Sequence, residues 1–228
     1  MQLILLFIML VWLPVFAQTG DGQPEDTVRL VEKTQFVNSK EMVVAGHPLA
    51  VAAGAEILKD GGSAVDAMVA VQMVLNLVEP QSSGIGGGAF LLHHDAETQQ
   101  VVAIDGREVA PALATEHLFL DDSGKARSWP DVVPGGLSVG VPGTLALMKH
   151  AYAKFGRLPW GELFDHAIQH AEMGFPVSPR LAGSLNSYGG QRLKQFDEGR
   201  RHFFPDGKPL AAGEILKNPA FADTLRHI

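Results

Sequence analysis

Apolar and polar positions in the first half of the chain follow patterns that predict a strand and then two helices. The apolar run over residues 42–45 predicts a short buried strand, and the proline at the start of residues 48–59 suits the first turn of a helix. Ser63 and Asp66 have the spacing of a capping box, so we expect a second helix over 64–78. Because that helix is apolar on nearly every side, it should be buried.

The later patterns predict a hairpin and three more helices. Two runs rich in β-forming residues, 89–94 and 101–105, are separated by the polar stretch DAETQQ, which is typical of a hairpin turn. Helical spacing of apolar residues predicts helices over 144–155, from 159 to about 173, and from Pro219 onward. The last of these has no C-terminal cap before the sequence stops, so we expect the chain to be a piece of a longer protein.

The N-terminal residues form an apolar run that resembles a signal peptide more than a folded element. Residues 3–16 form an uncharged apolar run, shorter than the roughly 20 residues of an ordinary membrane span, and the letters VFA before residue 18 suit a cleavage site. We therefore predict a signal peptide over 1–17, a mobile leader over 18–38 and a folded region over 39–228. This predicts a periplasmic or secreted protein, with an uncleaved N-terminal membrane anchor as the alternative.

Composition narrows the function classes. Hydrophobic residues make up 46% of the 228 residues and charged residues 19%, which is typical of a globular protein rather than a disordered one. The net charge of −7 argues against a nucleic-acid partner, because nucleic-acid binders carry basic patches. The chain has no cysteine, which excludes a cysteine nucleophile, a zinc ribbon and a lipoprotein anchor in this sequence.

The glycine run in EPQSSGIGGGAF, residues 79–90, satisfies the loose dinucleotide-binding pattern G-x-G-x-x-A. A phosphate cradle of that kind needs a strand before the glycines and a helix after them, whereas here the predicted helix precedes and the predicted strand follows. The run is therefore interpreted as a helix-to-strand turn, in which glycine permits positive φ and close backbone approach. We favour a glycine-lined wall against which a ligand or another chain packs.

Two other patterns suggest chemistry only weakly. Residues 136–140 match the nucleophile motif G-x-S-x-G, but glycine and proline flank them on both sides, so we expect a loop instead of a strand–turn–helix elbow. His166 and His170 lie about one helical turn apart without a third ligand, and we interpret them as solvated residues beside an apolar face. His93 and His94 should point to opposite faces of a strand. No metal or other cofactor is predicted.

Arg107 is the candidate binding residue. It follows the predicted strand 101–105 directly, and a strand end is a rigid platform for the planar guanidinium group. Such a group suits a substrate carboxylate, or else it forms a surface pair with Asp105 or Glu108. The spacing alone leaves both interpretations open.

Three stretches of the chain resemble one enzyme family, in the same order. They are GHPLAVAAGAEILKDGGSAVDAMVAVQMVLNLVEPQSSGIGGGAFLLHH, DGREVAP and VGVPGTLALMKHAYAKFGRLPWGELFDHAIQHAEMGFPVS. Together they resemble the N-terminal part of the large subunit of the γ-glutamyltransferase (γ-glutamyltranspeptidase) family, over about residues 40–228. Several spaced motifs in the correct order are more specific than any single glycine pattern.

The resemblance implies an α+β protein with a partial N-terminal-nucleophile hydrolase fold, a four-layer αββα sandwich that is incomplete without the small-subunit half. The family's precursor cleaves itself, and the new N-terminal threonine of the small subunit attacks the γ-glutamyl amide of substrates such as glutathione. The acyl group then passes to an amino acid, a peptide or water. Arg107 matches the arginine of the family motif D-x-R-E-x-A-P, which binds the substrate α-carboxylate. Val109 and Ala89 replace a usual threonine and a frequent glycine.

The resemblance also implies what this chain lacks. The family's threonine, its oxyanion donors and most contacts to the substrate amino group lie beyond residue 228, so we predict no catalytic residue in this chain, which alone should be inactive. Its partner is expected to be a small subunit. The alternatives are a non-catalytic partner or truncated remnant, and a related acylase acting on glutaryl or cephalosporin amides. Expressed alone, the chain should expose sheet edges and apolar surface and aggregate.

Overall fold

The computed structural model describes residues 35–38 and 40–228. The chain divides into two compact units, of which residues 36–228 form the second and carry every element named below. The predicted signal peptide over 1–17 and most of the predicted leader over 18–38 lie outside the described residues.

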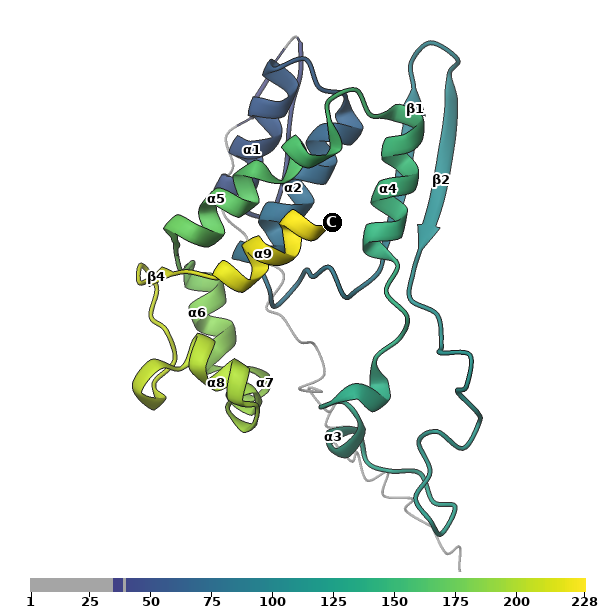
Figure 1. Cartoon of the computed structure of the whole chain (residues 1–228), viewed down its shortest axis with the longest axis vertical. Coiled ribbons are helices and arrows are strands. Elements are labelled where there is room, and N and C mark those ends of the chain that lie inside the picture. Colours follow the sequence, from purple (N-terminus) through teal and green to yellow (C-terminus); the bar gives the residue numbers. More distant parts are fainter. Residues whose placement is uncertain (1–34, 39) are drawn as a thin grey trace, which may run out of the picture. The chain divides into compact units, whose positions relative to one another are not determined.

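Helices predominate in the described part of the chain (Figure 1). They are α1 (Pro48–Lys59), α2 (Ala64–Val78), α3 (Trp129–Val132), α4 (Thr144–Phe155), α5 (Asp165–Met173), α6 (Pro179–Asn186), α7 (Tyr188–Gln191), α8 (Asp197–Phe203) and α9 (Pro219–His227). The strands form two antiparallel pairs, β1 (Ala89–Asp95) with β2 (Gln100–Gly106) and β3 (Phe175–Pro176) with β4 (Ile215–Leu216). Short 3₁₀ turns are η1 (Gly136–Ser138), η2 (Trp160–Phe164), η3 (Arg192–Gln195) and η4 (Pro205–Gly207).

The start of α2 confirms the predicted capping box and shows a second role for it. Ser63 Oγ accepts a hydrogen bond from the Asp66 N–H at 3.1 Å, and the Asp66 carboxylate accepts one from the Ser63 N–H at 2.8 Å. The same buried carboxylate also accepts hydrogen bonds from the backbone N–H groups of Arg157 at 2.9 Å and Leu158 at 3.2 Å. One side chain therefore caps α2 and holds the segment that follows α4 against it.

The strand predicted over residues 42–45 is wrong. This segment is not paired with any described strand, although its side chains still alternate between half-buried and exposed. Val43 lies beside α1 at Gly54, where a Cβ atom would come within 3.0 Å of it, whereas Met42 and Val44 are exposed. The sequence supplies the pattern of a strand, but no described segment offers the neighbouring backbone that a ladder needs.

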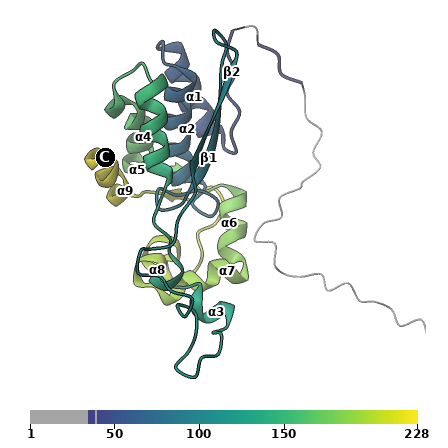
Figure 2. The ribbon, with the colours of Figure 1, turned by 90° about the vertical axis from the view of Figure 1, so that its right-hand side faces the viewer.

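The predicted hairpin is confirmed as β1 and β2, with Ala89 opposite Gly106 and Asp95 opposite Gln100. Helix α4 covers one face of this pair, as Figure 2 shows. Phe155 of α4 stacks on the His93 ring with centroids 4.0 Å apart, whereas His94 points to the other, exposed face. The expectation of opposite faces for the two histidines is therefore confirmed.

The core lies where α2 packs against α1, α4 and α5, and α9 covers α5. The helix predicted from residue 159 begins instead with the 3₁₀ turn η2 and becomes α-helical only at Asp165; 3₁₀ turns are frequent at helix N-termini. It ends before Gly174, whose φ of 95° only glycine adopts easily. The predicted helix at Pro219 is confirmed as α9. Fully buried side chains in this core include Met73, Val74, Met148, Leu163, Phe164, Ala167 and Ala222.

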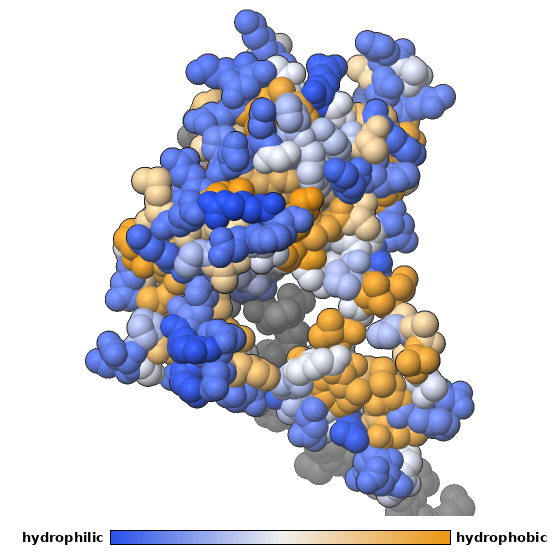
Figure 3. Space-filling view, viewed as in Figure 1, coloured by the Kyte–Doolittle hydropathy of each residue, from blue (hydrophilic) through white to orange (hydrophobic). Residues whose placement is uncertain are grey.

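The segment between β2 and α4, residues 107–143, exposes much apolar surface. Figure 3 shows hydrophobic residues gathered over the part of the chain that carries α3. Its exposed large hydrophobic side chains are Val109, Leu113, Phe119, Trp129, Val133, Leu137, Val139 and Val141. Within the described residues, no helix combines the length and the apolar character needed to cross a membrane.

Candidate functional site

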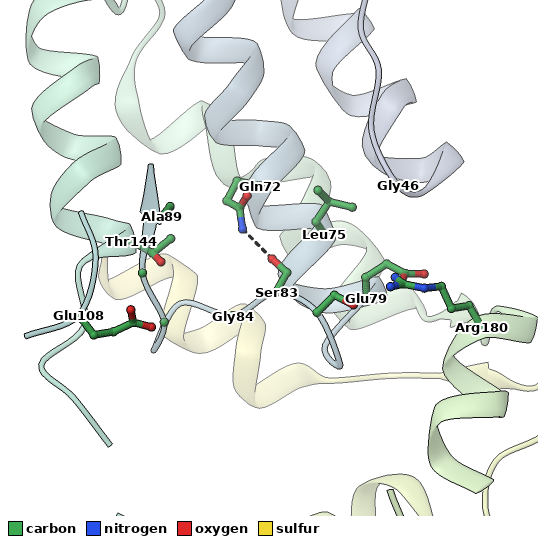
Figure 4. Close-up of a pocket in the computed structure, with 13 residues that line it drawn as sticks. Gly46, Gln72, Leu75, Glu79, Ser83, Gly84, Ala89, Glu108, Thr144 and Arg180 are labelled. Carbon is green, nitrogen blue, oxygen red and sulfur yellow. Dashed lines mark hydrogen bonds and ion pairs between the residues drawn. The ribbon is translucent and has the colours of Figure 1, made fainter. Parts of the chain in front are cut away.

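A cavity of about 460 Å³ opens beside the glycine run, and we call it the glycine pocket (Figure 4). The end of α2, the glycine run, the start of α4 and the residue after Arg107 all contribute to it. Its lining residues are Gly46, Gln72, Leu75, Glu79, Ser82, Ser83, Gly84, Gly87, Gly88, Ala89, Glu108, Thr144 and Arg180.

The glycine run is anchored to α4 through its backbone. The carbonyl oxygen of Gly87 accepts hydrogen bonds from the N–H groups of Gly143 at 3.0 Å and Thr144 at 3.1 Å. These donors belong to the N-terminus of α4, where N–H groups have no partner within the helix. The turn thus occupies donors that a phosphate would need in a nucleotide site, which agrees with the rejection of the dinucleotide pattern.

The glycines are required for close packing and not for an unusual backbone conformation. The expectation of positive φ in the run is wrong, because none of Gly84, Gly86, Gly87 and Gly88 adopts it. At Gly88, however, a Cβ atom would lie 2.5 Å from a carboxylate oxygen of Glu108. The run is therefore a wall against which the Glu108 side chain of the same chain packs, and the packing of a ligand or another chain there stays a prediction.

An ion pair between a buried carboxylate and a half-exposed arginine forms one side of the pocket. The Glu79 side chain is only 4% exposed and forms an ion pair with the Arg180 guanidinium group of α6. It also accepts hydrogen bonds from Gln81 Nε2 at 2.6 Å and from Ser178 Oγ at 3.3 Å. Because a buried carboxylate is costly without partners, this network fixes α6 to the end of α2.

A second polar network fixes the first residues of the glycine run. Gln72 Nε2 donates hydrogen bonds to Ser83 Oγ at 2.6 Å and to Asn76 Oδ1 at 2.8 Å, and the Ser83 hydroxyl donates to the same Asn76 oxygen. The Asn76 Nδ2 atom is buried without a hydrogen-bond partner among the described residues. The Ser83 hydroxyl therefore has a defined orientation beside the pocket, as Figure 4 shows.

Arg107 lies at the end of β2, next to the pocket but not in its lining. Its backbone N–H donates to Asp105 Oδ1 at 2.9 Å, which orders the turn after the strand. Within the described part of the chain, no carboxylate forms an ion pair with its exposed guanidinium group, so the surface pair with Asp105 or Glu108 is not formed here. The side chain that enters the lining is that of Glu108, which packs on Gly88.

The remaining candidates do not form a chemical site. Ser138 of the G-x-S-x-G motif lies in η1 and donates to the Val133 carbonyl oxygen at 2.9 Å, so the predicted loop is confirmed. His166 and His170 are half-buried and not solvated as predicted, because α5 packs that side against α1 and α2. Within the described residues, no group of three or more His, Cys, Asp or Glu side chains is arranged to hold a metal ion.

Most of the residues that line the pocket are not predicted from the sequence. The sequence suggests Glu108 only as a pairing partner of Arg107, and Glu79 only as part of a glycine-rich stretch. Thr144 and Arg180 carried no recognisable signal, because they come from helices distant in sequence from the glycine run. The one available signal was the position of Glu79 after a buried helix, where a charge needs a partner.

Comparisons with known proteins agree on one family. Residues 50–228 match the family model described as gamma-glutamyltranspeptidase. The glutathione hydrolase proenzyme of Bacillus subtilis (strain 168) is 42% identical over 192 residues, which cover 84% of this chain and 32% of that protein. The glutathione hydrolase proenzyme of Escherichia coli (strain K12) is 37% identical over 201 residues, which cover 87% and 34%. This chain thus spans about a third of the length of these relatives.

Solved structures show the same relationship. The gamma-glutamyltranspeptidase of Helicobacter pylori superposes with a TM-score of 0.79 at 36% identity, over 85% of this chain and 55% of that one. The cephalosporin acylase of Bacillus halodurans gives a TM-score of 0.71 at 30% identity, over 88% of this chain and 39% of that one. The predicted α+β class and partial N-terminal-nucleophile hydrolase fold are confirmed. The chain belongs to the γ-glutamyltranspeptidase family.

Proposed function

We propose that this chain supplies the N-terminal part of the large subunit of an enzyme that transfers or hydrolyses γ-glutamyl groups. Glutathione and other γ-glutamyl amides are the proposed substrates. The observation that carries the proposal is the position of Arg107, which is unpaired within the described residues, at the end of β2 beside the glycine pocket, in a chain that belongs to this family.

In this proposal the chain binds and orients the substrate, and the chemistry takes place on the partner. Arg107 forms a charge-assisted pair with the substrate α-carboxylate. The hydroxyl of an N-terminal threonine on the small subunit attacks the γ-carbonyl carbon, and the amine leaves with a proton. The resulting ester is then attacked by an amino acid, a peptide or water, which restores the hydroxyl.

The proposal includes processing and export. Two of the relatives reported above are proenzymes by name, so a precursor that yields a large and a small subunit is the proposed form of the complete protein. Export through a signal peptide over residues 1–17 is proposed from the apolar run before residue 18.

The test of substrate binding is Arg107→Ala in the complete two-subunit enzyme, assayed with a γ-glutamyl anilide. We expect KM to rise by about 10- to 100-fold, because a charge-assisted contact to the carboxylate is lost, with a smaller change in kcat. With a 4-aminobutyryl anilide, which lacks that carboxylate, KM should be the same for variant and parent. Arg127→Ala removes an exposed arginine of the same segment and should leave both parameters unchanged.

Three outcomes would contradict the proposal. An equal rise in KM for both anilides would remove Arg107 from carboxylate recognition. A strong preference for glutaryl over γ-glutamyl anilide would favour the alternative of an acylase, the activity named for the Bacillus halodurans structure. Turnover of the γ-glutamyl anilide by the 228-residue chain alone would show that the nucleophile lies within it.

A further inference from the structure

The N-terminus of α1 is capped by a titratable side chain. His47 is 9% exposed, and its Nδ1 atom accepts a hydrogen bond from the Leu49 N–H at 3.2 Å. The common capping residues are Ser, Thr, Asp and Asn, of which Ser, Thr and Asn keep their acceptor at every pH. Histidine accepts at Nδ1 only while that nitrogen carries no proton. This cap therefore exists only for the neutral imidazole with its proton on Nε2.

Protonation of this imidazole is unfavourable for two further reasons. The positive end of the helix dipole lies at the N-terminus, where it repels a cation. His47 is also buried, and a buried charge without a compensating partner is costly. Accordingly the pKa of His47 is lowered, mainly by burial, while the Glu79 carboxylate at the end of α2 acts in the opposite direction.

Two histidines of α5 face α1, His170 toward the capped end with His47 and His166 toward Glu56 in the last part of the helix. Burial lowers the pKa of His170, and the neighbouring His166 and His47 lower it further. His166 has one partner on α1, since its Nε2 atom lies 3.5 Å from Glu56 Oε2. The titratable groups that act on or near His47 are thus Glu79, which follows α2 and is already paired with Arg180, and His170 of α5. Protonation at low pH therefore adds positive charge near His47, where the nearby Glu79 carboxylate is already paired with Arg180.

The cap is next to the glycine pocket in sequence and in space. Gly46, the residue before His47, lines that pocket together with Leu75 and Glu79 of the α2 end, as Figure 4 shows. The His47 carbonyl oxygen also accepts hydrogen bonds from the N–H groups of Ala50 and Val51 at 3.1 Å each. Loss of the His47 cap should therefore affect both the first turn of α1 and the side of the pocket formed by Gly46.

We propose that His47 is an acid-sensitive cap, whose protonation releases the first turn of α1 and loosens the Gly46 wall of the glycine pocket. This device concerns the fold of the wall, so it holds whether or not the chain takes part in γ-glutamyl transfer. The proposed acid-sensitive cap requires no bound ligand.

The direction of the pH dependence follows from proton linkage. The folded-state pKa of His47 lies below the ordinary value of about 6.5, so the unfolded or frayed state binds the proton more tightly. The stabilisation by the neutral cap is complete above about pH 6.5 and is lost as the pH falls through the lowered pKa. Acid therefore weakens the first turn.

The experiment compares hydrogen exchange at Ala50 and Val51 at pH 7.5 and pH 5.0, corrected for intrinsic exchange rates, in the folded protein. Between these pH values we expect the parent to lose protection by about fivefold at both amides, a loss typical of a missing cap. His47→Asn keeps a capping oxygen without titrating in this range, so its loss should stay below about twofold. His150→Gln replaces an exposed histidine of α4 and should behave as the parent.

Two further measurements keep the inference open to refutation. His47→Asp serves if the asparagine variant does not fold, because aspartate also caps helices and stays ionised above pH 5. An NMR titration of the parent imidazole needs no variant, and a pKa at or above 6.5 for His47 would overturn the proposal. The same fivefold loss in both capping variants would overturn it as well.

Discussion

The two faces of the β1–β2 hairpin carry similar apolar residues in opposite surroundings. On the inner face, Leu91 and Ile104 are half-buried and pack against the core. On the outer face, Phe90 is 66%, Leu92 77% and Val101 64% exposed. Strands with apolar residues on both faces are typical of sheets covered on both sides. The hairpin sequence therefore suits a sheet covered on both faces, whereas the helices of the described residues cover one face.

The sharpest test of this comparison exchanges an aromatic residue of the core and one of the outer face for alanine. Phe164 is 1% exposed, so Phe164→Ala should lower the free energy of unfolding by about 3–5 kcal/mol. Phe90→Ala removes the same atoms from an exposed position and should change it by less than about 0.5 kcal/mol. Urea denaturation of both variants measures the difference. Equal losses would mean that the outer face is buried.

A second test compares two glycines of the run that precedes β1, one tightly packed and one open. In Gly88→Ala the new Cβ would lie 2.5 Å from the Glu108 carboxylate and 2.8 Å from its backbone nitrogen, so we expect a loss of about 1–3 kcal/mol. Gly84→Ala meets no atom within 4 Å and should be neutral or slightly stabilising. Thermal unfolding of the pair measures this, and similar melting temperatures would argue against a tightly packed wall.

A third test changes the exposed outer face of the hairpin, where we expect little effect on stability but a clear effect on solubility. The chain expressed alone should self-associate through its exposed apolar side chains, and Leu92→Lys should reduce that association while changing stability by less than about 0.5 kcal/mol. Sedimentation velocity measures the association. Leu91→Lys puts the same charge on the inner face and should disrupt the fold. A parent chain that sediments as a monomer with a sharp near-UV circular dichroism spectrum would contradict the expected aggregation.

The sequence predicted correctly those elements whose ends are fixed by hydrogen bonds between residues a few positions apart. The capping box at Ser63 placed α2, and the polar turn after Asp95 placed the hairpin, because hydrogen bonds between near neighbours determine both. The segment 42–45 has the same apolar character but no described strand beside it, so periodicity alone gave the wrong element. The helix after residue 159 was found, although its first turn is 3₁₀.

The printed sequence was enough to predict the family, helices α1, α2, α4 and α9, the β1–β2 hairpin and Arg107 as the candidate for carboxylate binding, but not α3, α6, α7, α8 or the β3–β4 pair. The folded structure was needed to show that four side chains line one pocket, those of Glu79, Glu108, Thr144 and Arg180. It was also needed to show that close packing, and not positive φ, explains the glycine run. The physical reason is range: caps and turns depend on residues a few positions apart, whereas Glu79 meets Arg180 across 101 positions. Contacts of that kind leave no periodicity in the sequence, because packing between helices selects them.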